Sequence, residues 1–295
     1  MKNGFEWPTL AVLAITYAVW GLATTVLAEM SLTAAVLLTG IAIAQFSSLQ
    51  HEMIHGHPFR RPWMNAALVF PALLPVIPYE RFRDQHLAHH RDSDLTDPFD
   101  DPESNYLCPD RWSRLPRPVQ ILLNVNNTLL GRMLLGPAIG TAVFLWTEAK
   151  TAHSDPRVRR GWALHLLALL PLVFWLGWIS PMPVWAYAVA AYLGMSLLKI
   201  RTFLEHQAHE KVRGRTVIID ETGPLAMLFL MNNFHVIHHM HPRVPWYRLP
   251  TLFRANRARY LRQNDGYSYR SYAEVFRLYL FHRKDLVPHP LMPRG

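Results

Sequence analysis

Long apolar runs and short turns alternate with polar segments along this chain of 295 residues. Each run approaches the roughly 20 residues that a helix needs to cross a bilayer. The runs cover residues 9–28, 32–50, 161–179 and 184–200. Only residues 29–31 separate the first two runs, and only residues 180–183 separate the last two. The pattern predicts an all-α integral membrane protein with four transmembrane helices in two hairpins.

Two further apolar stretches contain residues that disturb a membrane-spanning helix. Residues 63–79 include three prolines, and residues 119–147 include Arg132 and Pro137. Proline removes a backbone donor, and a charged side chain in the bilayer is costly. We expect both stretches to form interfacial or buried helices rather than spans.

The distribution of basic residues predicts which side of the membrane the polar segments occupy. None of the 30 Lys and Arg residues lies in either hairpin turn. Positive charge favours the cytoplasmic side, so both termini and the segments 51–160 and 201–295 are expected there, as a helical cap. Because no repeat or long linker interrupts them, we expect a single domain, 1–295.

Composition narrows the class of protein. Hydrophobic residues make up 51% of the chain and charged residues 17%, against about 25% charged in a typical soluble domain. The net charge of +9 suits a cytoplasm-facing membrane protein, so we expect no nucleic-acid partner. The single cysteine, Cys108, excludes an intrachain disulfide and any metal site built from several cysteines.

Eight of the 16 histidines fall into three clusters with helical spacing. The clusters are His51 and His55; His86, His89 and His90; and His235, His238 and His239. Residues at i, i+3 and i+4 share one face of a helix, so each cluster directs two or three imidazoles at one point. Imidazole is a neutral ligand suited to Zn, Cu, Fe or Ni. The clusters therefore predict a metal site.

A ninth candidate ligand, His206, follows the fourth apolar run directly. Nine imidazoles exceed the four ligands of a tetrahedral zinc ion, and two ions with four or five nitrogens each would use them. With four spans, all three clusters and His206 face the same side of the membrane. The metal site and the charge distribution thus favour the same number of spans.

The histidine clusters and the paired hairpins together resemble the membrane fatty-acid desaturases of the histidine-box, non-haem diiron family. The resemblance covers nearly the whole chain. The Leu95–Pro98 segment and the run at 232–239 are similar to bacterial members. Val244–Pro250 is similar to the related carotenoid ketolases. The resemblance implies a bacterial inner-membrane protein with its metal site on the cytoplasmic side.

The resemblance also implies a ligand set for two Fe ions. These ligands are His51, His55, His86, His89, His90, His206, His235, His238 and His239. No catalytic residue beyond the ligands is implied. One departure is Thr202, which stands where some members have an asparagine that contacts iron through water.

The reaction implied by the resemblance is an O2-dependent oxidation of an unactivated C–H bond in a lipid that enters from the bilayer. Removal of a second hydrogen gives a double bond, as in a desaturase, whereas oxygen insertion makes the protein a hydroxylase or carotenoid ketolase. No residue in the sequence distinguishes these outcomes. The sequence lacks a His-Pro-Gly-Gly haem motif, so electrons are expected from a separate ferredoxin- or cytochrome b5-like protein. Arginines 248, 254, 257, 259 and 262 would bind such a donor or anionic lipid headgroups.

Other functional classes share parts of this pattern. His51–His55 is also an HExxH sequence, the motif of zinc proteases in which Glu52 is the general base. That interpretation leaves both HxxHH clusters unexplained. A haem-bearing anchor or a metal transporter would carry polar ligands inside the spans, which largely lack them.

The acidic loop Asp92–Glu103 resembles a calcium-binding loop without its glycine. We expect instead that one of its aspartates orients an imidazole of the second cluster. His209 and His241 each lie three residues from a candidate ligand and are alternatives to His206 and His238. His165, in the third apolar run, is expected to be a packing residue.

Overall fold

The structure of this chain is a computed structural model that describes residues 6–90 and 95–292. The chain divides into two compact units, each described by itself below. Unit one comprises Met1–Asp84 and Ala138–Leu197, and unit two comprises Gln85–Pro137 and Leu198–Gly295. Three helices run from one unit into the other along the chain: α5 (Tyr79–His89), α8 (Leu129–Thr151) and α10 (Val184–Thr202).

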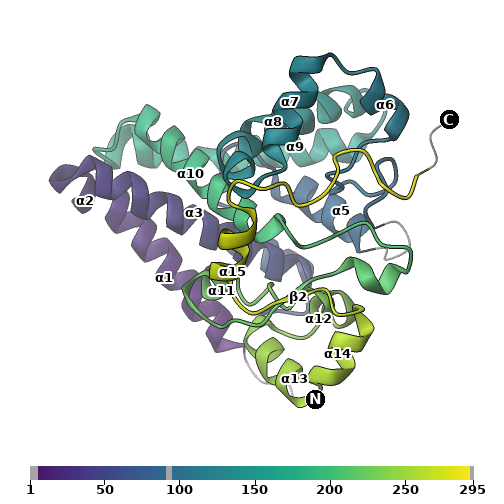
Figure 1. Cartoon of the computed structure of the whole chain (residues 1–295). Helices are drawn as coiled ribbons and strands as arrows, with labels where there is room; N and C mark the ends of the chain where they lie inside the picture. The colour runs from purple at the N-terminus through teal and green to yellow at the C-terminus, as the bar shows by residue number, and fades with distance from the viewer. Residues whose placement is uncertain (1–5, 91–94, 293–295) are drawn as a thin grey trace. The chain divides into compact units, whose positions relative to one another are not determined.

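Unit one is built on the first hairpin. Helix α1 (Trp7–Thr24) continues as the short α2 (Val26–Met30), and α3 (Leu32–Ile54) begins at Ser31, whose Oγ accepts a hydrogen bond from the Ala34 N–H. A serine at this position satisfies a backbone donor of the new helix and so defines the turn. Helices α1 and α3 lie side by side (Figure 1). The remaining elements are α4 (Pro62–Leu68), α9 (Pro156–Phe174) and the π-helical turn η2 (Trp175–Ile179).

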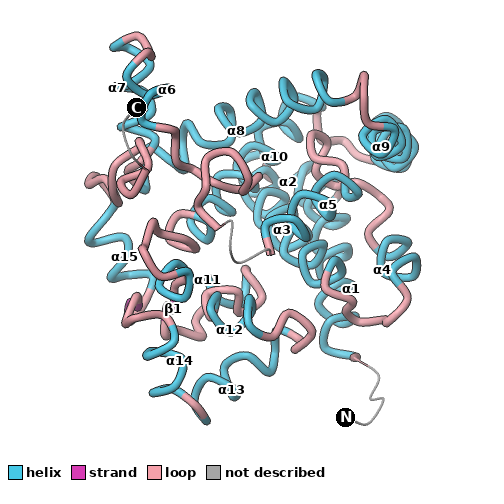
Figure 2. Tube along the Cα trace, turned by 90° about the vertical axis from the view of Figure 1, so that its right-hand side faces the viewer, coloured by secondary structure: helices cyan, strands magenta, loops and turns pink. Residues whose placement is uncertain are grey.

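Unit two consists of short elements joined by long irregular segments, as Figure 2 shows around α12. Its strands β1 and β2 pair in parallel, with Ile218 opposite Ser268 and Ile219 opposite Tyr269. Elements α13 and α14 pack against α12, which carries the third histidine cluster. The elements are α6 (Pro109–Ser113), α7 (Arg117–Asn126), η3 (Val212–Arg215), β1 (Ile218–Ile219), α11 (Pro224–Leu228), α12 (His235–Met240), η4 (Trp246–Arg248), α13 (Leu249–Ala255), α14 (Arg257–Gln263), β2 (Ser268–Tyr269) and α15 (Tyr272–Tyr279).

Four helices in the described part of the chain are long and apolar enough to cross a membrane. Three of them, Trp7–Met30, Leu32–Ile54 and Pro156–Ile179, contain the predicted spans 9–28, 32–50 and 161–179. The mostly helical fold with four candidate spans is therefore confirmed.

The fourth candidate corrects the prediction for residues 119–147. Helix α8 is an uninterrupted helix of 23 residues, because Pro137 lies inside it without ending it. The predicted span 184–200 is helical as part of α10 but is not among the candidates, and the last turn of α10 carries Lys199 and Arg201.

A buried ion pair ties three helices of unit one together. The Arg81 guanidinium donates to both Glu148 carboxylate oxygens, with Nε–Oε2 at 2.7 Å and Nη2–Oε1 at 3.0 Å. Trp162 Nε1 donates to the same carboxylate at 3.0 Å. Nearby, His165 is buried and its Nε2 hydrogen-bonds the Pro75 carbonyl at 2.7 Å, which agrees with the expected packing role.

Helices α3 and α10 approach each other closely at two glycines of unit one. A Cβ atom built on Gly194 would lie 2.9 Å from the Gly40 carbonyl oxygen, and one built on Gly40 would lie 3.0 Å from the Ala190 carbonyl oxygen. Small residues allow such close backbone approach, which is a main source of helix association within a membrane. The crossing therefore requires glycine at these positions.

We predict that Gly194→Ala destabilises the protein by about 1–3 kcal/mol, because the new methyl group forces the helices apart. The matched control is Gly177→Ala, since a Cβ there meets nothing within 4 Å. In that helical turn the change should be neutral or slightly stabilising. Thermal unfolding of both variants in detergent, followed by circular dichroism, measures the difference. A Gly194→Ala protein as stable as the parent would show that the crossing is looser than described.

Candidate metal centre

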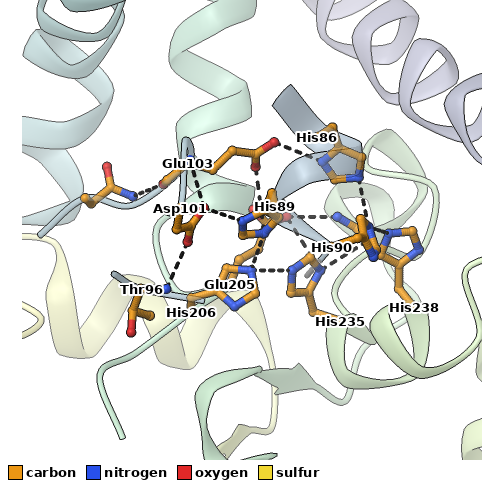
Figure 3. A network of polar contacts seen from close by, with 12 residues as sticks. His86, His89, His90, Thr96, Asp101, Glu103, Glu205, His206, His235 and His238 are labelled. Atoms are coloured by element: carbon orange, nitrogen blue, oxygen red, sulfur yellow. Dashed lines mark hydrogen bonds and ion pairs between the residues drawn. The ribbon is translucent and has the colours of Figure 1, made fainter. Parts of the chain in front are cut away.

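Unit two brings seven of the candidate histidines together. Figure 3 labels all of them except His239. Helix α5 ends with His86 and His89, and His90 follows it directly. Helix α12 carries the third cluster, and its spacing places all three rings on the same side of the helix. His206 comes from the irregular segment after α10.

Four of these histidines form one group, called here the four-histidine group: His89, His206, His235 and His239. One ring nitrogen from each lies within 4.8 Å of the others. The Nε2 atoms of His89 and His206 are 2.8 Å apart, and those of His235 and His206 are 3.0 Å apart. His206 therefore joins the second and third clusters.

The remaining three histidines form a second group, called here the three-histidine group: His86, His90 and His238. Their ring nitrogens also lie within 4.8 Å of one another. The Nε2 atom of His90 is 3.0 Å from that of His86 and 3.1 Å from that of His238. The second and third clusters, which both have the HxxHH pattern, thus each contribute histidines to both groups.

Carboxylates from the acidic loop accept hydrogen bonds from Nδ1 of two of the rings. His89 Nδ1 donates to Asp101 Oδ1 at 2.7 Å, and His86 Nδ1 donates to Glu103 Oε1 at 2.9 Å. Asp101 is itself fixed, because it accepts the Thr96 N–H at 2.9 Å through Oδ2. A proton held at Nδ1 leaves the Nε2 lone pair available to a metal ion. The structure thus shows the expected contact between an aspartate of this loop and the second cluster.

A third orienting contact was missed from the sequence. Asn232 Oδ1 lies 3.3 Å from His235 Nδ1, and Asn232 Nδ2 donates to Glu205 Oε1 at 2.8 Å. Glu205 is buried in an ion pair with Arg201, with Nε and Oε1 3.0 Å apart. The only signal in the sequence is position, because Glu205 precedes one candidate ligand and Asn232 lies three residues before another.

Burial and charge set the protonation of the rings. For His206 and His235, burial together with the neighbouring imidazoles holds the pKa well below its usual value. For His89, burial would lower the pKa, but the charge of Glu103 and the hydrogen bond to Asp101 outweigh it and raise the pKa to about 9. His206 and His235 are therefore neutral at pH 7, the form that binds a metal ion.

The chemistry of this donor set fits metal ions. Two Nε2 lone pairs about 3 Å apart repel each other unless a proton or a cation lies between them. Nitrogens that each lie about 2.1 Å from one ion are about 3.0 Å apart at an octahedral angle and about 3.4 Å apart at a tetrahedral angle. The Nε2–Nε2 distances of 2.8–3.1 Å lie close to the octahedral spacing. Seven imidazoles in two groups exceed the needs of one ion and suit two ions of the first transition row.

The first histidine cluster lies in unit one. His51 is in the last turn of α3, where it is buried, and His55 follows the helix directly. Their ring centroids are 4.9 Å apart. Glu52 is buried in the same turn.

The alternative ligands lie outside both groups. His209 Nδ1 accepts a hydrogen bond from the Lys211 N–H at 3.1 Å, and His241 packs edge-on against the Tyr260 ring, with centroids 6.3 Å apart. Part of the calcium-like loop, residues 92–94, lies outside the described residues. Its described carboxylates Asp101 and Glu103 contact imidazoles.

Comparison with known proteins places these residues in a wider context. The model of a family described as "Fatty acid desaturase" matches residues 30–271, a range that contains all nine candidate histidines. The chain is also similar to a beta-carotene ketolase of Paracoccus sp. (strain N81106 / MBIC 01143). The two are 26% identical over 223 residues, which cover 72% of this chain and 75% of the ketolase.

We predict that Asp101→Asn lowers the affinity for iron by about 10–100-fold, because a neutral amide holds the His89 ring less firmly than a carboxylate does. Asp100→Asn is the matched control, since Asp100 is the exposed neighbour on the same loop. Titration of metal-stripped protein with Fe²⁺ against a chelator measures both. Equal affinity in the two variants would contradict an orienting role for Asp101.

Proposed function

The chain belongs to the fatty acid desaturase family, and we propose that it is an O2-dependent oxidoreductase that introduces a double bond into a fatty-acyl or related lipid chain. The observation that carries this proposal is the convergence of seven imidazoles into two groups in unit two. An all-nitrogen site for two metal ions suits O2 chemistry, which protein side chains cannot perform alone.

The proposed cofactor is a pair of Fe ions, one in each histidine group. We propose that His51 and His55 complete the ligand set, giving nine ligands in all. The proposal places all three clusters on one face of the membrane, where nine imidazoles can reach one pair of ions.

The chain's own residues have definite tasks in this proposal. When bound, the iron pair supplies the activation of O2 that removes hydrogen from an unactivated C–H bond. Asp101, Glu103 and Asn232 each hold a proton at Nδ1 of a ligating ring and so keep its Nε2 lone pair directed inward. The buried Glu205–Arg201 pair fixes Asn232 in turn. No residue beyond the ligands is assigned a step on substrate.

The proposed partners are a lipid that enters from the bilayer and a separate electron donor. Exposed arginines lie on α13 and α14, the helices that pack against α12, and on η4 before them. They are Arg248, Arg254, Arg257, Arg259 and Arg262. Such a surface suits an acidic ferredoxin- or cytochrome b5-like protein, and its position close to the third cluster gives electrons a short route. The proposed location is the bacterial inner membrane, with termini and metal site in the cytoplasm.

A carotenoid ketolase is the second candidate, because the chain is similar to one over most of its length. A ketolase and a desaturase would use the same histidines, and they differ in product. A desaturated lipid has lost two hydrogens, whereas a ketolated one has exchanged two hydrogens for an oxygen. Expression in cells that make β-carotene, with mass spectrometry of acyl lipids and carotenoids, separates the two. An unchanged profile of both lipid classes from iron-loaded protein would overturn the proposal.

We predict that purified protein binds about two irons per chain, that His206→Ala loses one of them together with its activity, and that His209→Ala keeps both irons and its activity. His206 belongs to the four-histidine group, and His209 does not. Elemental analysis of both variants, after a check of membrane insertion, provides the measurement. One zinc and no iron in the parent would favour the HExxH protease interpretation instead.

We predict that Glu52→Gln retains substantial oxidation activity, because the diiron proposal gives this carboxylate no proton-transfer step. A zinc protease would lose all activity with its metal content intact. Product analysis of the variant beside the parent, at matched metal content, is the measurement. Complete loss of oxidation would give Glu52 a role that the proposal does not include.

A further inference from the structure

His206 differs from the other histidines of unit two in how its backbone is held. His86 and His89 lie on α5, His90 directly follows them, and α12 carries the other three. A helix fixes the backbone of its residues through its own hydrogen bonds. His206 instead lies beyond the end of α10 at Thr202 and pairs with Thr216 in an isolated antiparallel bridge. Two backbone hydrogen bonds flank the bridge, from the Val217 N–H to the Glu205 carbonyl at 3.2 Å and from the Gln207 N–H to the Arg215 carbonyl at 3.0 Å. Yet its Nε2 lies 2.8 Å from that of His89 and 3.0 Å from that of His235.

Besides this bridge, two side chains from distant parts of unit two hold the segment. The Lys284 ammonium donates a hydrogen bond to the His206 carbonyl oxygen. The Tyr106 hydroxyl accepts the Ala208 N–H at 2.9 Å and donates to Asp285 Oδ2. Residues 206 and 208 are therefore both tied, directly or through Tyr106, to the adjacent pair Lys284 and Asp285.

The pair is itself anchored to the body of unit two. Asn127, at the end of α7, donates through Nδ2 to the Asp285 carbonyl at 3.0 Å and to Asp285 Oδ1 at 3.1 Å. The Lys284 N–H donates to the Asn127 carbonyl at 3.0 Å. Further along the chain, the Leu107 N–H donates to the Val287 carbonyl at 2.9 Å, and the His289 N–H donates to the Leu107 carbonyl at 2.8 Å. Residues 284–289, called here the C-terminal strap, are thus fixed at several points.

Burial makes these contacts specific. The Lys284 side chain is 10% exposed, and a charged amine loses much hydration when it is buried so deeply. Its charge is offset by the His206 carbonyl, by Asp285 Oδ2 at 3.9 Å and by the Tyr106 ring, whose centroid is 5.8 Å away. A lysine at the surface could hold residues 284–289 in place without this cost. The burial of Lys284 therefore suggests that its role lies in its contact with the His206 carbonyl.

We infer that the C-terminal strap positions His206 for metal binding, with Lys284, Asp285 and Tyr106 as positioning residues. The inference rests on the proposed metal centre and extends it beyond the matched family region, which ends at residue 271. In this role the strap fixes the backbone of residues 206–208, and the backbone in turn fixes where the imidazole can reach. The ligand atom and its orienting support come from segments almost 80 residues apart.

The test compares Lys284→Met and Tyr106→Phe with two matched controls. Arg277→Met removes an exposed positive charge on α15, and Tyr279→Phe removes a hydroxyl that pairs with the Tyr269 hydroxyl. Each protein is stripped of metal and titrated with Fe²⁺ against a chelator, and the exchange of backbone amides 204–210 is followed by mass spectrometry. His206→Ala provides the reference for loss of this ligand.

We expect both strap variants to bind one of two irons about 10–100-fold more weakly, with the same pattern as His206→Ala, and to exchange amides 204–210 faster. The controls should match the parent. Lys284→Arg keeps a donor and should recover affinity, which a general loss of stability would not allow. If Lys284→Met does not fold, Tyr106→Phe decides whether the strap has this role, because removing a single hydroxyl disturbs the fold less.

Two results distinguish a failure of the strap's role from a failure of the proposed function. A parent with two irons and strap variants of parental affinity would overturn the role of the strap and leave the proposed function intact. A parent that binds no iron after reconstitution would overturn the proposed function and, with it, the strap's role in metal binding. In that case faster exchange at 204–210 would show only that the strap holds the loop.

Discussion

The hydrogen bonds behind the imidazoles are the interactions on which the candidate metal centre depends. A histidine ring can rotate and can carry its proton on either nitrogen. Contacts from Asp101, Glu103 and Asn232 to Nδ1 settle the tautomer of three rings and turn their Nε2 atoms inward. Those atoms then face other imidazole nitrogens at 2.8–3.0 Å, a spacing that only a proton or a cation makes favourable. The residues that hydrogen-bond Nδ1 of these rings therefore prepare the site for metal binding, although they do not ligate the metal themselves.

The parts of this site that were predictable from the sequence are those governed by local geometry. Spacing at i, i+3 and i+4 on a helix has one structural meaning, so the clusters on α5 and α12 were expected to point their rings together. The acidic loop follows the second cluster closely in the sequence, so we expected one of its aspartates to contact an imidazole of that cluster. Asp101 makes this contact with His89. The mostly helical architecture also follows from the apolar runs alone.

The parts that were missed depend on contacts between distant segments. Nothing local connects Lys284 or Tyr106 with His206, and Asn232 reads as part of a histidine motif rather than as a link to Glu205. The error over α8 has a different origin. Pro137 was taken to interrupt the apolar stretch, but neighbouring turns kept the helix continuous. Proline is a weaker breaker in an apolar helix than in an exposed one, because packing compensates for the lost hydrogen bond.

The strap also has a consequence for the order of events during synthesis. A chain is made from its N-terminus, and its elements fold as they emerge. Helices α5 and α12 can place their rings as soon as α12 is complete, whereas His206 gains its support only when residues 284–289 have been made. On this arrangement the four-histidine group matures after the last of its ligands has been synthesised.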